Sequence, residues 1–374
     1  MQTNHWIWQN KDWPKLTFDA DKLLTGVGAA AHLIGELEAV SRSIKEEERV
    51  DALERVLADD AIETAAIEGE ILRRSSVRSS IRKRMGLPIE QEDWDDRADG
   101  LITMLFDARN QKPSPLTRER LLGWHAALFP TGYSGLKKIH VGKYRGHEEM
   151  QIVSGPVGKE TIHYIAPPKD GLENEMEVFL KWVNSNDEYH PLIRAGIAHL
   201  WFIMLHPFDD GNGRVGRAIT DYIMSINYPS LMQVISFSKH FSLDRKGYYK
   251  VLEEAGKQGL NITGWLTWFL QTTIAAMQEA HWTVDQVVMK AQFWQLHNYT
   301  SLNPRQVKVV NRLLDAGEKF EGGMTTRKYA SMAKCSKVTA SRDLTDLLNK
   351  RILQKTAAGG RSTSYQIRIA PPKQ

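Results

Sequence analysis

One continuous run, residues 206–217, combines side chains and glycines that could do chemistry on a phosphate. It reads His-Pro-Phe-Asp-Asp-Gly-Asn-Gly-Arg-Val-Gly-Arg. Gly211 and Gly213 would let backbone N–H groups approach an anion closely, and a helix beginning near Arg214 would point its positive end the same way. Arg214 and Arg217 lie on one helical turn, where both guanidinium groups could reach phosphate oxygens. The run predicts a phosphate-binding loop.

The same run supplies a candidate metal ligand and a candidate base. Asp210 offers a carboxylate oxygen beside the predicted phosphates, and Mg²⁺ is usually held by one such carboxylate together with substrate oxygens. His206 could accept a proton from an attacking hydroxyl group. For any one of these residues alone, the simpler interpretation is a helix corner with a buried histidine and solvated arginines. Taken together, they favour nucleotidyl or phosphoryl transfer.

The segments around this run must hold it in place. Before it, apolar residues from Ile193 to Met204 recur on one helical face, so His206 should lie at the end of a rigid element. Residues 139–168 break the helical pattern and predict a β-hairpin. Residues 20–84 are helical in pattern, and one helix should end near Gly69, because glycine adopts a positive φ without steric cost.

The run matches the Fic family signature, His-x-Phe-x-(Asp/Glu)-Gly-Asn-Gly-Arg-x-x-Arg, at every specified position. The chain resembles that family over roughly residues 60–285. The resemblance implies a mainly α fold, with a Fic-type helical core and a β-hairpin flap. It also implies that His206 deprotonates a Ser, Thr or Tyr hydroxyl of a target protein, which then attacks the α-phosphate of ATP and releases pyrophosphate.

The resemblance implies a role for each remaining site residue. Asp210 would hold Mg²⁺, Gly211 to Gly213 would form the anion hole with Asn212 fixing the loop, Arg214 and Arg217 would take the β- and γ-phosphates, and Tyr249 would contact ATP. The edge of the hairpin would pair with the target's backbone. Because Gly213 and both arginines are intact, AMP transfer is favoured over transfer of phosphate or phosphocholine.

Upstream, residues 64–69 resemble the family's inhibitory motif, (Ser/Thr)-x-x-x-Glu-(Gly/Asn), with Thr64, Glu68 and Gly69 at its specified positions. The resemblance implies that Glu68 pairs with Arg217 and makes ATP bind unproductively. In some relatives the same glutamate positions a water that removes AMP from the target, so the net direction stays open. The simpler alternative is a helix end with a solvated acid and a glycine cap.

The last part of the chain has a basic composition and resembles a winged-helix domain. Two helices are predicted at 325–330 and 337–350, with small and basic groups at 336–342, and a wing is predicted at 352–367 with its tip at 359–361. Such a domain could bind DNA. Protein contacts or homodimer formation are the alternatives.

The composition is that of a soluble globular protein, with 49 basic and 45 acidic residues and a lone cysteine, Cys335. These features exclude an internal disulfide framework and favour a reducing compartment. No secretory signal is apparent, and the apolar windows 193–205 and 265–277 are too short to span a membrane, so we expect a cytoplasmic protein without membrane contact.

We divide the chain into an N-terminal region with the inhibitory helix (1–90), a Fic catalytic domain (91–298) and a winged-helix domain (299–374). The first residues, with Trp6, Trp8 and Trp13, are predicted to form an extended segment that packs through its aromatic rings. The histidines without metal-ligand spacing are predicted to be structural: His140, His147, His163 and His199. A DNA-binding regulator whose Fic core only senses nucleotide is the alternative function, but it would not need His206.

Overall fold

The computed structural model describes residues 6–43, 46–89, 93–109, 114–156, 158–185, 189–257, 259–317, 320, 322–356 and 363–368. The chain forms two compact units, Met1–His281 and Trp282–Gln374. The boundary lies within one long helix, α11 (Thr263–Leu296). Residues 282–298, which the sequence assigned to the catalytic domain, therefore fall in the second unit.

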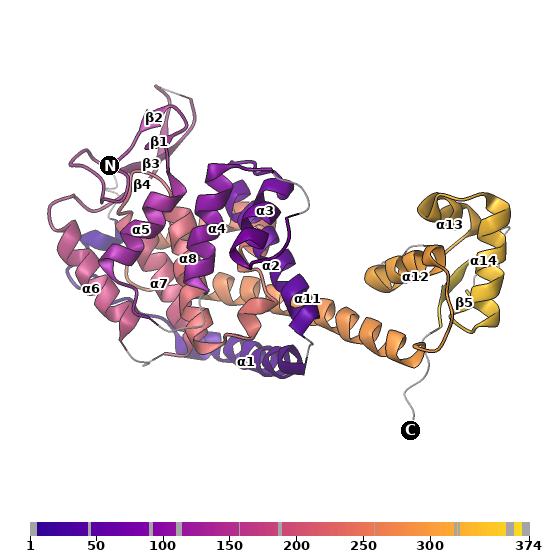
Figure 1. Cartoon of the computed structure of the whole chain (residues 1–374). Coiled ribbons are helices and arrows are strands. Elements are labelled where there is room, and N and C mark those ends of the chain that lie inside the picture. The colour runs from indigo at the N-terminus through magenta and orange to yellow at the C-terminus, as the bar shows by residue number, and fades with distance from the viewer. Residues whose placement is uncertain are drawn as a thin grey trace. The chain divides into compact units, whose positions relative to one another are not determined.

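The first unit is built mainly from helices (Figure 1). The predicted mainly α fold is confirmed. Before α11 the helices are η1 (Ile7–Gln9), α1 (Ala20–Ser43), α2 (Glu46–Ile67), α3 (Arg74–Arg84), α4 (Asp96–Ala108), α5 (Arg118–Leu128), α6 (Leu172–Asn184), α7 (Pro191–Leu205), α8 (Asn212–Asn227), η2 (Leu231–Gln233), α9 (Phe237–Leu243) and α10 (Arg245–Lys257).

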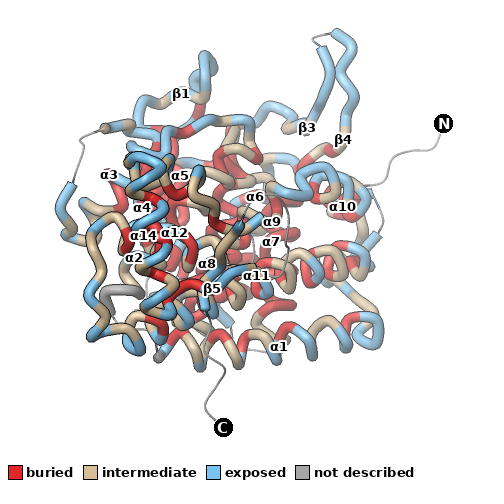
Figure 2. The backbone as a smooth tube through the Cα atoms, turned by 90° about the vertical axis from the view of Figure 1, so that its right-hand side faces the viewer, coloured by how far each residue is buried: buried red, intermediate tan, exposed pale blue. Residues whose placement is uncertain are grey.

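Helices α7 and α8 form the centre of this unit. Every residue of α7 from Leu192 to Leu205 is buried, because the helix is apolar on nearly all sides and must be covered all round. Helix α8 packs directly against it and is buried from Val215 to Ser225. Figure 2 colours buried residues red, and red segments lie beside the α7 label. The loop that joins them, residues 206–211, is therefore held by two buried elements.

A buried charge cluster fixes α2 against this centre. Arg109, at the end of α4, donates to Asp221 of α8 through Nε at 2.8 Å, and it also pairs with Asp60 of α2. Asp60 in turn accepts hydrogen bonds from Ser236 Oγ (2.6 Å) and the Ser238 backbone (3.1 Å). These contacts join α2 to α4 and α8. Removing one member of such a buried cluster would leave an uncompensated buried charge, which is strongly destabilising.

The predicted β-hairpin is present, and we call it the flap. Strands β3 (Gln151–Ser154) and β4 (Thr161–Ile165) pair antiparallel, with Gln151 opposite Ile165. Ile139 to Arg145, which the sequence placed at the start of this hairpin, is not a strand. A shorter hairpin precedes it instead, formed by β1 (Tyr133–Ser134) and β2 (Lys137–Lys138).

Three further expectations need correction. The N-terminal segment is not fully extended, because residues 7–9 form a 3₁₀ turn. Helix α8 begins at Asn212, not near Arg214. The helix best suited in length and composition to cross a membrane is Ala20–Arg42, with a mean hydropathy of 1.3, and not one of the two windows singled out from the sequence. That helix also has residues packed into the first unit's core, among them Leu23 and Leu37.

The second unit has its own apolar core around Val310, Tyr329 and Leu344. After the end of α11 it contains α12 (Pro304–Ala316), α13 (Thr326–Ala333), α14 (Lys337–Asn349), β5 (Leu353–Lys355) and β6 (Tyr365–Ile367). Helices α13 and α14 correspond to the two helices predicted from the sequence, and β5 pairs antiparallel with β6 where a wing was predicted. The predicted wing tip at 359–361 lies outside the described residues.

Candidate active site

His206 follows the last residue of α7 and has a left-handed backbone conformation, with φ of 47°. Its backbone N–H donates to Phe202 O (3.1 Å), and its ring Nδ1 lies 3.2 Å from Ile203 O. Because a carbonyl can only accept, Nδ1 must carry the hydrogen, which leaves the lone pair on Nε2. Burial lowers the pKa of His206 to about 4, so the ring is neutral at pH 7. A neutral imidazole with its lone pair on Nε2 can act as a general base.

The loop after His206 is pinned through its backbone. Arg145 donates from Nε to His206 O (2.9 Å) and from its backbone N–H to Pro207 O (2.9 Å). The Asn212 amide accepts from Phe208 N (3.0 Å) and donates to Phe208 O (2.8 Å). These bonds hold His206 and the start of α8 in one fixed arrangement.

His125 supports the same loop from α5. Its ring stacks on Phe208 with centroids 4.0 Å apart, and Nε2 lies 3.2 Å from Asp210 O. Its Nδ1 accepts from Gly142 N at 3.1 Å. Burial lowers the pKa of His125 to about 4, which keeps it neutral in this role. Neither His125 nor Arg145 was assigned a role from the sequence, because both act through contacts between segments far apart in the chain.

The N-terminus of α8 already faces a carboxylate, that of Glu68. A Cβ built on Gly213 would lie only 2.1 Å from Glu68 Oε1, so the missing side chain makes room for the acid. Glu68 Oε1 also lies 2.7 Å from Arg217 Nη2. An anion at a helix N-terminus is favoured by the helix dipole. Glu68 therefore occupies the place expected for a phosphate oxygen.

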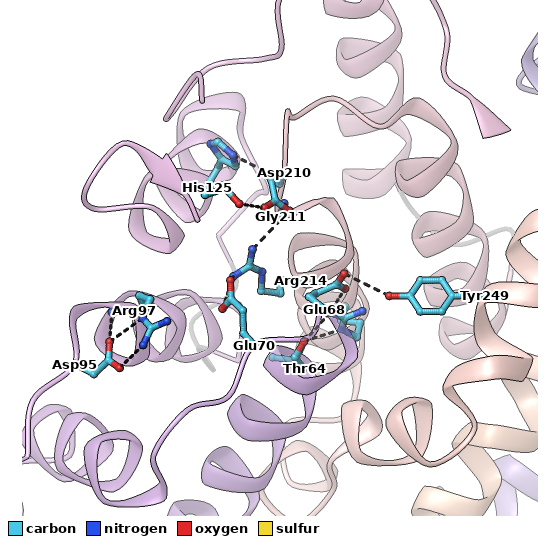
Figure 3. Close-up of polar contacts among 12 residues, drawn as sticks. Thr64, Glu68, Glu70, Asp95, Arg97, His125, Asp210, Gly211, Arg214 and Tyr249 are labelled. Carbon is cyan, nitrogen blue, oxygen red and sulfur yellow. Dashed lines mark hydrogen bonds and ion pairs between the residues drawn. The ribbon is translucent and has the colours of Figure 1, made fainter. Parts of the chain in front are cut away.

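The end of α2 holds Arg217 through more than this ion pair. Arg217 donates from Nε to Thr64 Oγ1 (2.6 Å) and from Nη2 to Thr64 O (3.0 Å). From α10, the Tyr249 hydroxyl donates to Ile67 O (3.1 Å) and lies 3.4 Å from Glu68 Oε2. Gly69 follows with φ of 82° and makes the turn that ends the helix. Thr64 and Glu68 thus hold Arg217, and Tyr249 contacts Glu68; Figure 3 labels Thr64, Glu68 and Tyr249 in this cluster.

Arg214 is also held by a carboxylate, which the sequence analysis missed. Its Nη1 lies 2.9 and 3.0 Å from the two carboxylate oxygens of Glu70, two residues beyond Glu68 (Figure 3). Gly69 turns the chain between the two glutamates, so that Glu68 reaches Arg217 and Glu70 reaches Arg214. The sequence does show a second glutamate, Glu70, just after the inhibitory motif. Only the fold shows that this glutamate reaches Arg214.

Both arginines are almost completely buried, with exposed side-chain fractions of 3% for Arg217 and 4% for Arg214. Burial by itself would lower the pKa of Arg217, but the neighbouring Glu68 raises it above its ordinary value. Among the described residues, Arg217 Nη1 and Arg214 Nε have no hydrogen-bond partner. Buried donors of this kind are costly unless an anion satisfies them.

Asp210 lies at the mouth of the loop with 40% of its side chain exposed. Oδ1 accepts from Gly211 N (2.6 Å) and lies 3.8 Å from Arg214 Nη2, and Oδ2 accepts from Ser134 Oγ. In the part of the chain that the structure describes, no group of three or more His, Cys, Asp or Glu residues could hold a metal. A lone exposed carboxylate fits Mg²⁺ only where substrate oxygens and water complete the ligand shell.

Two segments of the chain match models of known protein families. Residues 115–224 match the model of the Fic/DOC family. The chain therefore contains a Fic/DOC domain. Residues 6–87 match a second model, described as a domain of unknown function, DUF4172.

Curated Fic relatives are similar over about half of this chain. The protein adenylyltransferase Fic of Aedes aegypti is 33% identical over 200 residues, which are 52% of this chain and 36% of that protein. The protein of the same name from Nematostella vectensis is 26% identical over 196 residues, 51% of this chain and 41% of that protein. The Fic chain spans about two fifths of the length of these relatives.

Solved Fic structures share the fold. A Fic family protein from Desulfovibrio desulfuricans G20 matches with a TM-score of 0.55 and 20% identity, covering 96% of this chain and 99% of that one. A Fic domain containing signaling protein from Bacteroides thetaiotaomicron matches with a TM-score of 0.50 and 16% identity, over 70% of this chain and 97% of that one. The chain thus shares the mainly helical fold of these Fic structures.

The other histidines of the Fic chain lie in ordinary polar contacts. His199 is fully buried between Thr220 Oγ1 (3.1 Å) and Tyr248 OH (2.8 Å). Three more histidines each face one carboxylate: His140 with Asp209, His147 with Asp170 and His163 with Glu253. Of these histidines, His140 reaches the loop, where its backbone N and its Nδ1 both lie 2.8 Å from Asp209 Oδ2.

Proposed function

We propose that this Fic protein transfers AMP from ATP to a Ser, Thr or Tyr hydroxyl of a target protein, with His206 as the general base. The observation that carries the proposal is the neutral His206 ring, with its lone pair on Nε2, fixed beside a helix N-terminus and two buried arginines. The names of the curated relatives support the same reaction.

In this proposal His206 Nε2 takes the proton of the target hydroxyl as its oxygen attacks the α-phosphorus of ATP. A new P–O bond forms to the target, and the bond between the α-phosphorus and the bridging oxygen breaks. Pyrophosphate leaves with that electron pair. The backbone at Gly211, Asn212 and Gly213 and the start of α8 would stabilise the phosphates.

The charged side chains would then orient ATP. Arg214 and Arg217 would bind the β- and γ-phosphates through their guanidinium forks. Asp210 would hold Mg²⁺, which when bound would neutralise phosphate charge. Tyr249 would contact ATP from α10, once it is released from the end of α2.

We further propose that the described conformation is inhibited by two acids, not one. Glu68 pairs with Arg217 and Glu70 pairs with Arg214, so both predicted phosphate ligands already have carboxylate partners. ATP phosphates must displace these carboxylates to reach the guanidinium groups productively. A role for Glu68 in positioning water, which would remove AMP from a modified target, is the alternative use of the same contact.

The proposed reaction is tested by the position of the label in ATP. Glu68→Gly protein is incubated with lysate proteins and Mg²⁺, in parallel with ATP labelled at the α- or at the γ-phosphate. AMP transfer predicts protein labelling from the α-label and none from the γ-label, since the γ-phosphate leaves in pyrophosphate. Labelling from the γ-phosphate alone would establish phosphate transfer instead.

The second unit supports a further partner, DNA. The exposed residues of α14 near its start are small, apolar or basic: Lys337, Val338, Ser341, Arg342 and Thr345. The acid in this stretch, Asp343, points inward, where it pairs with Arg305 (3.0 Å) and accepts from Tyr329 OH (3.0 Å). The next acid along α14, Asp346, has 43% of its side chain exposed but pairs with Lys350 (2.6 Å). A basic exposed face suits a DNA backbone and groove. Protein contacts or a homodimer are the alternative uses of this face.

If DNA binding were the main activity, the Fic core would serve only as a nucleotide sensor. His206 would then be dispensable, whereas AMP transfer requires it.

We also propose a cytoplasmic protein, since a reducing compartment fits the single cysteine.

A further inference from the structure

The N-terminal tryptophan segment, residues 6–17, lies against the base of the flap. Trp6 is 5% exposed, and its ring meets the Tyr164 ring edge to face at 5.4 Å. The Trp8 indole Nε1 donates to Ile165 O at 2.8 Å. Tyr164 and Ile165 are the last two residues of β4. The segment therefore contacts the flap where it joins the rest of the protein.

The direction of the Ile165 carbonyl shows which edge Trp8 occupies. The next residue, Ala166, donates its N–H to Met150 O on the β3 side (2.9 Å). In a trans peptide the C=O and the following N–H point in opposite directions. Ile165 O must then point away from β3, to the outer edge of β4. Trp8 covers that edge at the flap base.

The same base is connected to the helix that carries His206. The Tyr164 hydroxyl donates to Met204 O (2.9 Å), two residues before His206. Trp6 on one side and Met204 on the other thus fix the Tyr164 ring. The position of β4 relative to His206 depends on this buried contact.

The rest of the tryptophan segment is tied to the helical framework. Trp13 Nε1 donates to Glu175 of α6 (3.2 Å), and its ring lies 6.3 Å from that of Trp201 in α7. Thr17 pairs through its backbone with Leu260 and Ile262, each at 2.8 Å. Because Trp13 is anchored to α6 and Thr17 to the residues just before α11, the segment can act as a fixed support for the flap.

The outer part of the flap has few such supports. Val153 and Ile162 are 45% and 42% exposed. Near the middle of β4, His163 pairs with Glu253 of α10 (2.8 Å). The flap is therefore held at its base by the tryptophan segment and near the middle of β4 by α10.

We propose that Trp8 and Trp6 are positioning residues for the protein substrate. They set the flap at a fixed distance from His206, so that a target strand paired with the flap presents its hydroxyl in line with the α-phosphate. This inference rests on the proposed function and gives a role to the first residues of the domain of unknown function.

The test compares Trp8→Phe with a matched control, Trp13→Phe. Each change removes one indole N–H donor from the same segment, but only Trp8 contacts the flap. Hydrogen exchange of the flap amides, residues 150–166, should be about fivefold faster in Trp8→Phe than in Trp13→Phe, the effect of losing one hydrogen bond. Equal flap exchange in the two variants would overturn the inference. This measurement needs no activity, so it is separate from a failure of the proposed function.

The consequence for transfer is measured in the Glu68→Gly background. Labelling from α-labelled ATP is followed against increasing concentrations of lysate protein as acceptor. Trp8→Phe should lower the initial slope about fivefold, again the effect of one hydrogen bond, while the ATP concentration for half-maximal rate stays unchanged. Equal slopes for Trp8→Phe and Trp13→Phe would contradict a positioning role. If Glu68→Gly itself labels nothing, the proposed function fails and the exchange result still decides the structural part.

Discussion

At the scale of single residues, His206 combines an unusual backbone conformation with a perturbed side chain. Its positive φ turns the chain out of α7, and its Nδ1 hydrogen bonds to Ile203 O. Residues in sparsely populated backbone conformations tend to cluster at functional sites. The surroundings thus prepare His206 as a neutral proton acceptor before any substrate binds.

The pKa of His206 gives a direct prediction. Burial lowers it to about 4, and a histidine with a lowered pKa stays neutral until the pH falls through that value. The base should therefore be fully available from pH 6 to pH 8. An NMR titration of the ring, assigned with His206→Ala, should show almost no protonation at pH 6. A midpoint near the ordinary value of 6.5 would contradict the described environment.

Gly213 provides a second prediction at this scale, because its missing side chain makes room for Glu68. In Gly213→Ala the new Cβ would overlap Glu68 Oε1. Overpacking should lower the free energy of unfolding by about 1–3 kcal/mol in urea denaturation. In a Glu68→Gly background the cost should disappear or reverse, since alanine favours a helix over glycine by up to ~1 kcal/mol. An equal cost in both backgrounds would show that Glu68 does not lie there.

At the scale of elements, the end of α2 and the turn after it contact both arginines that we propose to bind phosphate. Glu70→Gln keeps the shape of the side chain but removes its charge, which frees Arg214 for ATP. We expect a non-hydrolysable ATP analogue to bind about three- to tenfold more tightly by calorimetry, a modest gain because Glu70 is partly exposed. The matched control is Glu36→Gln, which removes a glutamate that pairs with His32 and His281. Equal affinity in the two variants would exclude the second acid from inhibition.

The elements also show what the sequence could predict. The candidate phosphate-binding residues form a continuous run, so residue types and spacing were enough to single them out. Helix α7 and the flap could be predicted from their apolar patterns. Glu70, His125 and Arg145 could not be found this way, because each reaches the loop from a distant segment and local periodicity carries no record of tertiary contacts. The start of α8 was misplaced by two residues because Asn212 bonds to Phe208 and enters the helix earlier than its composition indicates.

At the scale of the whole molecule, the two compact units should carry separable activities. Charge reversal by Lys337→Glu and Arg342→Glu should weaken binding of a labelled DNA duplex by fluorescence anisotropy, and each change should reduce the salt dependence by about one ion. Lys22→Glu, at an exposed site on α1, is the control. AMP transfer should be unchanged in all three variants. If neither change on α14 alters the affinity for DNA, this face of α14 does not bind DNA.

The central claim joins these scales: a Fic fold in which His206 drives AMP transfer and the end of α2 restrains it. Its most direct test measures protein labelling from α-labelled ATP and Mg²⁺ by the wild type, Glu68→Gly, and the double variant Glu68→Gly with His206→Ala. The account predicts strong labelling by Glu68→Gly, weaker labelling by the wild type, and none by the double variant. Labelling by the double variant equal to that of Glu68→Gly would contradict it.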